Sequence, residues 1–311
     1  MTHRSVSGFF LAQTLPSETP LTGCFALTEG LNGHALPFST DDLFGPDALL
    51  GTAVPSLSAS SEGLFDVGAP VYLCHEVTST FNVGDALAKR GLLPAWSAVL
   101  ATQQSEGRGQ FRRHWQSPKG NLYVTFRLPN ASLFNTEAAA LFTGMLLTYA
   151  LNRLDYPLQL KWPNDLLSPD QTKAAGILVE KRNDILLAGV GINLHTLPDE
   201  AQLRHDRATP AGLLRSSDGK HTQLSPFGLW KALVNETISL YSHMFTQPAE
   251  KILPELADRF LAWKDQSVTL SDAGGSALRG ILRGVSPAGG LLIEQADGRI
   301  HERLSGNLAR T

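Results

Sequence analysis

Apolar positions recur with recognisable periods from about residue 71 to the end of the chain. Short runs rich in β-branched and aromatic residues are typical of strands, whereas apolar residues three or four positions apart are typical of helices. Residues 136–154, for example, place Ala138, Leu141 and Phe142 at helical spacing. The pattern predicts strands at residues 71–77, 95–103, 121–128, 158–162, 174–181 and 185–194, and helices at residues 83–90, 136–154, 226–245 and 249–262.

Two of these helices also carry start signals. Ser79 and Thr80 stand where a side-chain oxygen can cap the first helix, and Ser225 stands directly before Pro226. Serine and threonine accept hydrogen bonds from the free backbone N–H groups of a helix start, and proline is tolerated at the first helical position. We therefore expect both helices to begin next to these residues.

Residues 264–311 differ from the preceding part of the chain in their short strands and frequent turns. Glycine and proline separate apolar runs at residues 268–270, 278–285, 291–295 and 299–303. This pattern predicts a small β-barrel domain, which follows a domain of mixed strands and helices at residues 69–263.

Residues 1–68 form a third region, in which no helical or strand period is evident. The region is rich in Ser, Thr, Pro and Gly, and it contains seven acidic residues but only one Arg. Because a DNA-binding module presents a basic surface, this composition predicts that the region is not a DNA-binding helix-turn-helix. Its fold is not predicted.

The whole chain has the composition of an ordinary soluble globular protein. Its 311 residues are 42% hydrophobic and 18% charged, and a net charge of −3 gives no general attraction to nucleic acid or to an anionic membrane. Residues 9–12 are too short for the apolar core of a signal peptide, so we expect a cytoplasmic protein. Cys24 and Cys74 lack metal-ligand or redox spacing and are expected to be reduced thiols.

Residues 104–115 (QSEGRGQFRRHW) form a polar loop between two predicted strands. Gly107 and Gly109 let backbone amides approach a ligand, and arginines supply cationic forks for phosphate or carboxylate. A solvated basic loop is the alternative interpretation. The concentration of basic residues beside Trp115 favours an anion-binding site. These basic residues are Arg108, Arg112, Arg113 and His114.

Residues 161–165 (KWPND) end a predicted strand with a cation, an aromatic ring, a proline and two oxygen-bearing side chains. The side-chain oxygens of Asn164 and Asp165 are of the type that binds Mg²⁺ held by a phosphate group. An Asx turn stiffened by Pro163 is an equally good interpretation of these residues.

Two further segments place glycine inside apolar strands. Residues 173–180 (KAAGILVE) begin with Lys173, whose ammonium group would meet negative charge that develops at a carbonyl or an α-phosphate; an exposed lysine without function is the alternative. Gly176 and Gly189, the latter in GVGIN, mark either close approach of a ligand or a bulge. The sequence has no Walker phosphate loop, so nucleotide binding would need a less common cradle.

Taken in order, these segments resemble those of the biotin protein ligase family. The resemblance also includes EVTST at residues 76–80, SPKGNLYVTF at residues 117–126 and ILRGVSPAGGLLIE at residues 281–294. It covers about residues 70–311, and the order, the spacing and the strand and loop contexts all agree.

The resemblance implies an α+β fold, with a central mixed β-sheet that has helices on one face and a C-terminal SH3-like β-barrel. It implies an ATP-dependent ligase that also uses Mg²⁺. The carboxylate of biotin would attack the α-phosphate of ATP to give biotinyl-5'-AMP, and a lysine of a biotin carboxyl carrier protein would then receive the biotin. DNA and membranes are not expected partners, and a homodimer is left open.

Roles for individual residues follow from the same resemblance. Lys173 and Arg108 would be catalytic, and Asp165 would bind Mg²⁺ through ATP. The residues that would bind biotin are Ser79, Thr80, Gln104, Gly107, Arg108, Trp115, Lys173, Gly176 and Gly189. Those that would bind ATP are Arg108, Gly109, Arg113, Trp115, Asn164, Asp165, Lys173, Asn193 and Arg310.

The sequence departs from the family pattern at two places. Gln110 stands where an arginine is typical and Arg112 replaces a glycine, which predicts weaker retention of the adenylate. Phe81 stands where asparagine is common.

Three other functions are compatible with parts of the sequence. A lipoate or octanoate ligase shares the general fold, but KWPND, the arginine-rich loop and the barrel favour biotin. A biotin-responsive repressor would need a DNA-binding N-terminal region. A non-catalytic biotin-binding protein is disfavoured because Lys173 and Asp165 are both present.

Overall fold

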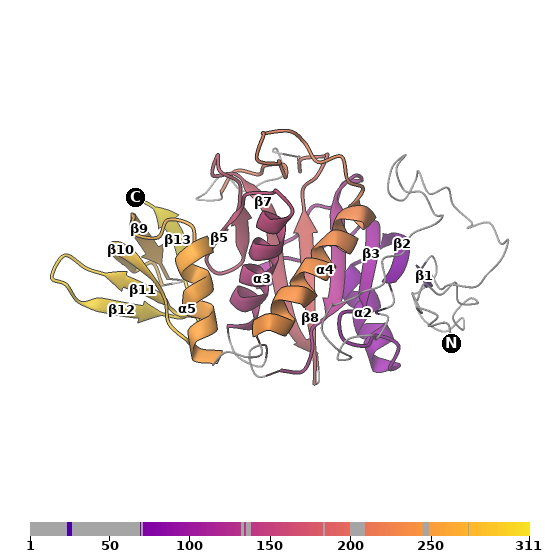
Figure 1. Ribbon diagram of the computed structural model, residues 1–311, viewed down its shortest axis with the longest axis horizontal. Helices are drawn as coiled ribbons and strands as arrows, with labels where there is room; N and C mark the ends of the chain where they lie inside the picture. The colour runs from indigo at the N-terminus through magenta and orange to yellow at the C-terminus, as the bar shows by residue number, and fades with distance from the viewer. Residues whose placement is uncertain are drawn as a thin grey trace, which may run out of the picture.

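A mixed β-sheet forms the centre of the computed structural model, and helices pack against it (Figure 1). The structure describes residues 24–26, 69 and 71–311, except residues 132–133, 135–137, 183, 200–208, 245–248 and 273. In this part of the chain the strand order is β1-β2-β3-β4-β8-β7-β6-β5, with β2 and β3 parallel and the other neighbours antiparallel. The strands are β1 (Cys24–Ala26), β2 (Val71–Val77), β3 (Ala98–Gln104), β4 (Leu122–Arg127), β5 (Gln159–Lys161), β6 (Asp165–Leu167), β7 (Lys173–Arg182) and β8 (Ile185–Ile192).

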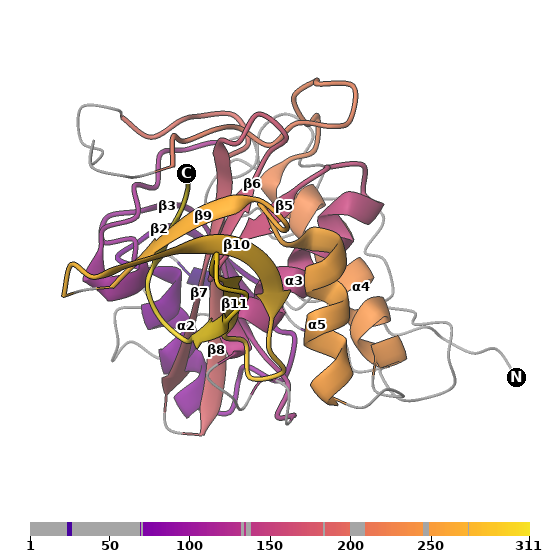
Figure 2. The ribbon, with the colours of Figure 1, turned by 90° about the vertical axis from the view of Figure 1, so that its left-hand side faces the viewer.

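Helices cover both faces of this sheet. Leu73 and Leu100 belong to the core under α3 and α4, whereas Tyr72 and Val99 belong to the core under α2. Neighbouring residues of a strand point to opposite faces, so α2 lies across the sheet from α3 and α4 (Figure 2). The expectation of helices on one face is corrected accordingly. The helices are α2 (Thr80–Lys89), α3 (Ala139–Arg153), α4 (Pro226–Met244) and α5 (Ala249–Phe260).

The predicted helix starts and most predicted strands are confirmed. The Ser79 side chain accepts a hydrogen bond from the Phe81 backbone N–H at 3.3 Å, and Ser225 accepts one from Gly228 at 3.1 Å. Strand β3 begins later than predicted because Trp96 has a left-handed backbone (φ 67°), which does not fit a strand. The short strand β6 is not predicted by the pattern.

The C-terminal part is a separate antiparallel sheet with the strand order β12-β11-β10-β9-β13, compatible with the predicted SH3-like barrel. The indole N–H of Trp162 donates to the backbone oxygen of Gly289 at 3.0 Å, which ties the KWPND segment to a barrel turn. Strand β13 is missed by the sequence pattern. The strands are β9 (Ser267–Ser271), β10 (Ala277–Val285), β11 (Leu291–Glu294), β12 (Ile300–Arg303) and β13 (Asn307–Arg310).

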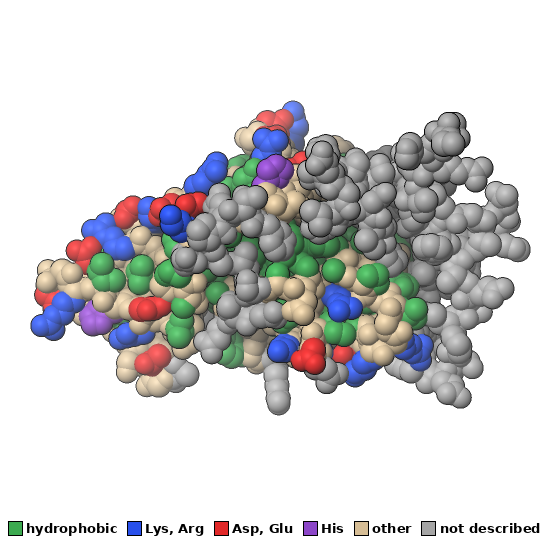
Figure 3. All heavy atoms as spheres, turned by 60° about the horizontal axis from the view of Figure 1, so that its bottom comes forward, with side chains coloured by type: hydrophobic (Ala, Val, Ile, Leu, Met, Phe, Trp, Pro, Cys, Tyr) green, Lys and Arg blue, Asp and Glu red, His purple; other side chains and the backbone are tan. Residues whose placement is uncertain are grey.

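Charges of both signs are mixed over the barrel end of the molecule, at the left of Figure 3. Arg283 pairs with Glu294 at 2.6 Å, and Arg299 lies 3.5 Å from Asp297. Such exposed pairs contribute little to stability, and their mixture leaves no surface of a single sign in this view. Within the described residues, the helices are too short or too polar to cross a lipid bilayer.

Cys74 differs from the expectation of a reduced thiol. Cys74 of β2 lies opposite Cys24 of β1 in the antiparallel register, and Cys74 is disulfide-bonded. Opposed positions on neighbouring strands lie within bridging distance, a proximity that cysteine spacing along the sequence does not reveal.

Asn121, at the start of β4, holds together the chain that follows β8. Its side chain is almost fully buried. The amide oxygen accepts from the backbone N–H groups of Leu194, His195 and Thr196 at 2.8 to 3.2 Å. The amide nitrogen donates to the Tyr123 hydroxyl and to the Thr196 backbone oxygen. One side chain thus satisfies backbone groups that are otherwise buried without partners.

We expect Asn121→Ala to lower the free energy of unfolding by about 2–4 kcal/mol, since buried donors would lose their acceptor. Asn121→Asp keeps the acceptor but sets a second oxygen against the Thr196 backbone oxygen, so it should also lose stability. Urea denaturation followed by circular dichroism measures both. A loss of under about 0.5 kcal/mol for Asn121→Ala, typical of an uninvolved surface residue, would contradict this role.

Candidate active site

A cavity of about 1070 Å³ lies on the same face of the sheet as α2, beside that helix. Its walls come from the start of α2, strands β5 to β8, the loop after β3 and residues 209–211. Residues at the ends of β9 and β13 complete the rim from the barrel side. Cavities of several hundred to a thousand cubic ångströms hold small-molecule ligands, so this one has room for a large ligand or for two smaller ones.

Strand register places two charged residues and two glycines in one row across the floor of the cavity. Lys161 of β5 is opposite Asp165 of β6, which is opposite Gly176 of β7. Gly176 in turn is opposite Gly191 of β8. Directly opposed residues of antiparallel strands project to the same face, so these four positions all face the cavity.

The two glycines provide space for Trp115. A Cβ atom on Gly176 would lie 2.8 Å from the Trp115 ring, and a Cβ atom on Gly191 would lie 2.5 Å from it. Any larger residue at either position would displace the indole. The Trp115 Nε1 atom is buried and has no hydrogen-bond partner among the described residues. This nitrogen lies directly over Gly191, on the side of the indole that faces the sheet.

An uncharged hydrogen-bonding group lies at the α2 end of the cavity. The Gln104 amide oxygen accepts from the Thr80 backbone N–H at 2.9 Å, the Thr80 hydroxyl at 3.1 Å and the Ser79 hydroxyl at 3.4 Å. The Gln104 amide nitrogen donates to the Ser117 hydroxyl at 2.9 Å. Ser79 and Thr80 are both buried. These residues are therefore preorganised to meet a neutral polar ligand group.

Lys173 and Asp165 form the charged centre of the cavity. The Lys173 ammonium lies 2.6 Å from an Asp165 carboxylate oxygen and 5.2 Å from the centre of a Trp115 ring. The backbone of Lys173 is fixed by hydrogen bonds to Pro210 and Gly212. A partly exposed lysine with one carboxylate neighbour can still turn toward an incoming anion.

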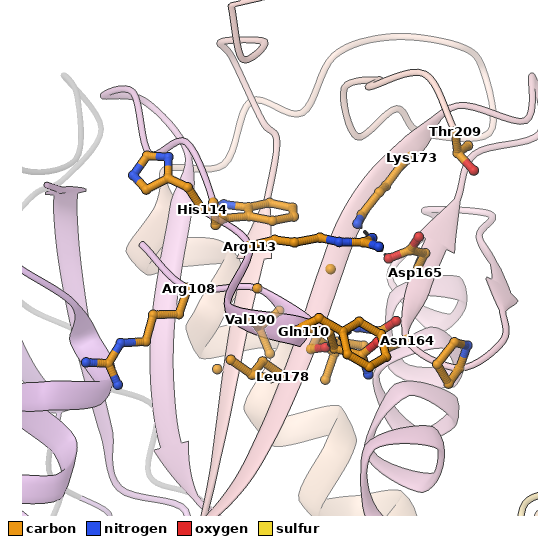
Figure 4. A pocket seen from close by; sticks show the side chains of 18 of the residues that line it. Arg108, Gln110, Arg113, His114, Asn164, Asp165, Lys173, Leu178, Val190 and Thr209 are labelled. Carbon is orange, nitrogen blue, oxygen red and sulfur yellow. Dashed lines mark hydrogen bonds and ion pairs between the residues drawn. The ribbon is translucent and has the colours of Figure 1, made fainter. Parts of the chain in front are cut away.

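The arginines of the loop after β3 take two different directions. The Arg108 guanidinium donates to the Asn82 side-chain oxygen of α2 at 2.7 Å, and Figure 4 shows it directed away from Asp165. Arg113 is directed toward Asp165 (Figure 4). Between them, Phe111 is 81% exposed and has a left-handed backbone, φ 56°. This conformation is strained for a residue other than glycine.

Most residues that the sequence assigns to the site line this one cavity. Gly107 and Arg310 are the exceptions. Gly107 is buried at the base of the loop, where an added Cβ atom would lie 2.2 Å from the Trp115 backbone oxygen. Arg310 is exposed, at the opposite end of β13 from Asn307, which does line the cavity.

Two asparagines of the site already have backbone partners. The Asn164 amide nitrogen donates to the Ile177 backbone oxygen at 2.6 Å. Asn193 is buried, and its amide nitrogen donates to the backbone oxygens of Gly212 and Lys173. Both side chains therefore help to hold the walls of the cavity in place.

The sequence assignment misses Phe81 and Lys161, which also line the cavity. Phe81 is buried, and a Cβ atom on Gly189 would lie 2.2 Å from its ring. The glycine inside β8 did signal a close approach, but the group that approaches it is this ring of α2. Lys161 is buried as well, and its position in KWPND was the available signal.

Comparison with known proteins identifies the family. The profile of the Biotin/lipoate A/B protein ligase family matches residues 76–196. The biotin–[acetyl-CoA-carboxylase] ligase of Paracoccus denitrificans is 32% identical over 128 residues, 38% of this chain and 52% of that protein. The bifunctional ligase/repressor BirA of Escherichia coli strain K12 is 30% identical over 256 residues, 72% of this chain and 69% of that protein. This chain belongs to the biotin protein ligase family.

The family assignment extends to the three-dimensional structure. The biotin protein ligase from Aquifex aeolicus, solved in complex with biotin and ATP, has a TM-score of 0.62 and 29% sequence identity. The similarity covers 78% of this chain and 99% of that chain. The predicted fold class is therefore confirmed for this biotin protein ligase family member. In the sequence comparison, this chain spans about half the length of the Paracoccus ligase.

The contact between Phe81 and Gly189 is open to a double-mutant test. Gly189→Ala should lower the free energy of unfolding by about 1–3 kcal/mol through overpacking. Phe81→Leu in the same chain should relieve the clash, so the double variant should lose less than the sum of the single variants. Thermal and urea denaturation of the three variants measure this. Additive losses would show that the two positions do not contact each other.

Proposed function

We propose that this chain activates biotin with ATP to form biotinyl-5'-AMP and then transfers biotin to a lysine of a biotin carboxyl carrier protein. The observation that carries the proposal is the order of chemical groups along one cavity. An uncharged polar group at Gln104 is followed by the glycine row under Trp115, and then by the Lys173–Asp165 pair. This order matches a ligand with a neutral polar head, an apolar middle and an anionic end.

The polar head would be the ureido ring of biotin. A ureido group has two N–H donors and one carbonyl acceptor, and the side chains of Ser79, Thr80 and Gln104 offer both donors and acceptors. Gly107 supports these residues from the base of the loop. Phe81, over Gly189, provides an apolar wall for the remainder of the molecule.

Lys173 would act where the two substrates meet. A carboxylate oxygen of biotin attacks the α-phosphorus of ATP and forms a mixed carboxylic–phosphoric anhydride. The bond from the α-phosphorus to the α–β bridging oxygen breaks, and pyrophosphate leaves. Two anions have to approach each other in this step, and a fixed ammonium group neutralises the charge that they share. In the second step the neutral amine of the carrier lysine attacks the biotinyl carbonyl carbon, and AMP leaves.

The side of the cavity near Trp115 and Asn164 would hold the nucleotide. The flat face of the Trp115 indole, which lines the cavity, suits an adenylate. Arg113 already points toward Asp165, whereas Arg108 would have to release Asn82 before it could reach a phosphate. Gly109, Asn193 and Arg310 complete the proposed nucleotide contacts.

Mg²⁺ would enter with ATP and be held by Asp165. Magnesium commonly binds through one or two carboxylates together with substrate phosphates, and the Asp165 carboxylate beside Lys173 fits this mode of binding. The described residues contain no cluster of three potential metal ligands that could form a site independent of the nucleotide. The metal would screen phosphate charge, while Asp165 keeps it beside Lys173.

The cellular setting and the partners remain proposals. We infer a cytoplasmic enzyme whose partner is the carrier domain of a biotin-dependent carboxylase, and a homodimer remains open. The Escherichia coli relative is named a repressor as well as a ligase. The prediction that this chain does not bind DNA concerns residues 1–68, which apart from residues 24–26 lie outside the described residues.

Substrate choice is the first test. Incubation with ATP, Mg²⁺ and a carrier domain should transfer labelled biotin to the carrier lysine, whereas labelled lipoate and octanoate should not be transferred. Mass spectrometry of the carrier identifies the product. Transfer of lipoate as fast as biotin would favour the lipoate ligase alternative, and tight biotin binding without transfer would favour a binding protein.

Lys173 is the second test. Lys173→Ala should reduce pyrophosphate release about 100- to 1000-fold, the usual effect of removing one preorganised charge donor. Lys173→Arg should recover little, because a planar guanidinium cannot replace a compact ammonium group at this position. Biotin binding by calorimetry should weaken less than catalysis. Retention of more than about a tenth of wild-type pyrophosphate release would contradict the catalytic role.

A further inference from the structure

Lys161 is a second cation at the cavity, and it is almost fully buried. Its side chain belongs to β5, one strand beyond Asp165, and only 5% of the residue is exposed. The ammonium nitrogen donates to the Thr209 hydroxyl at 2.9 Å and lies 5.4 Å from the centre of a Trp263 ring. No described carboxylate lies within ion-pair distance of it, and Asp165 pairs with Lys173 instead.

This arrangement is unfavourable for the protein alone. A buried charge is usually paired or strongly solvated, and a hydroxyl and an indole ring replace only part of the lost hydration. Burial lowers the pKa of Lys161, and the nearby positive charge of Lys173 lowers it further, against the opposing effect of Asp165. Two lysines thus share the Asp165 carboxylate, and the cavity lining as a whole has more cationic than anionic side chains.

The position of Lys161 in the sheet indicates which part of a nucleotide it would meet. Counting across the sheet, Gln104 lies at the end of β3, Lys173 begins β7 and Lys161 ends β5, at the edge of the strand order. Neighbouring strands are about 4.8 Å apart, so Lys161 is about two strand spacings, or roughly 10 Å, beyond β7 and on the side away from Gln104. If the α-phosphate of a nucleotide lies at Lys173, outer phosphates that extend away from Gln104 reach Lys161.

We propose that Lys161 binds the β- and γ-phosphates of ATP and then holds the departing pyrophosphate. This inference rests on the proposed function, because it takes the α-phosphate to be at Lys173. Lys173 would neutralise the reacting centre, while Lys161 would bind the leaving group. The buried ammonium group exchanges the partial solvation by Thr209 and Trp263 for a full countercharge when the phosphates arrive.

The decisive variant is Lys161→Met, which keeps the length of the side chain and removes the charge. Calorimetry with α,β-methylene-ATP, whose α–β bridge is not cleaved, should show an affinity loss of about 10- to 150-fold, the effect of one charged hydrogen-bonding group. AMP, which lacks the outer phosphates, should bind within about twofold of wild type. Inhibition by inorganic pyrophosphate should weaken in parallel with the ATP analogue.

Lys181→Met is the matched control, because Lys181 is an exposed lysine of β7 that does not line the cavity. It should leave the affinities for both nucleotides unchanged. The melting temperature of Lys161→Met separates a phosphate-binding role of Lys161 from a structural role. Replacing a buried unpaired charge with an apolar side chain should leave the melting temperature equal to or above that of the wild type.

Two results with the Lys161→Met variant would overturn the inference alone. Equal weakening of AMP and of α,β-methylene-ATP, with a lowered melting temperature, would make Lys161 a structural residue. An unchanged affinity for the ATP analogue would show that its outer phosphates lie elsewhere. A wild-type chain that binds biotin and neither nucleotide would instead contradict the proposed function, and the inference with it.

Discussion

The ion pair between Lys173 and Asp165 is the contact on which the arrangement of the cavity depends. Each residue comes from a different strand, and the 2.6 Å separation of their charged atoms requires β6 and β7 to keep their register. That register also places Gly176 beside Asp165, and Gly176 with Gly191 gives Trp115 its position. The charged centre, the flat surface next to it and the loop that carries Trp115 are therefore set by the same strand pairing.

The barrel contributes to this cavity through a small number of contacts. Trp162 donates to Gly289 in a barrel turn, and Trp263, just before β9, lies against the Lys161 ammonium group. The lysine and the tryptophan of the KWPND segment thus contact the barrel part, while the lysine and the aspartate both line the cavity.

Local sequence rules were sufficient for the elements that start with a clear signal. The range of β2 agrees with its prediction, and Ser79 caps α2 as expected because a side-chain oxygen can satisfy a free N–H without distant partners. The family motifs identified most of the residues that line the cavity. The sequence could not reveal which group approaches Gly189, because Phe81 is far from it along the chain.

The same limit applies to charges. Arg108 and Arg113 are equivalent by residue type, yet one binds Asn82 and the other points to Asp165, a difference made by the path of the loop. Likewise, nothing in the one-dimensional pattern shows that Lys161 is buried without a carboxylate partner. Long-range packing decides the direction of these arginines and the burial of Lys161. The hydrophobic periodicity of the sequence contains no information about that packing.

The central claim is that the Lys173–Asp165 centre joins the carboxylate of biotin to the α-phosphate of ATP before any carrier protein is involved. Exchange of labelled pyrophosphate into ATP measures this step directly, because exchange requires reversible formation of an adenylate. The account predicts exchange that needs biotin, proceeds without carrier protein and is not supported by lipoate. Absence of exchange with biotin, or equal exchange without it, would contradict the account.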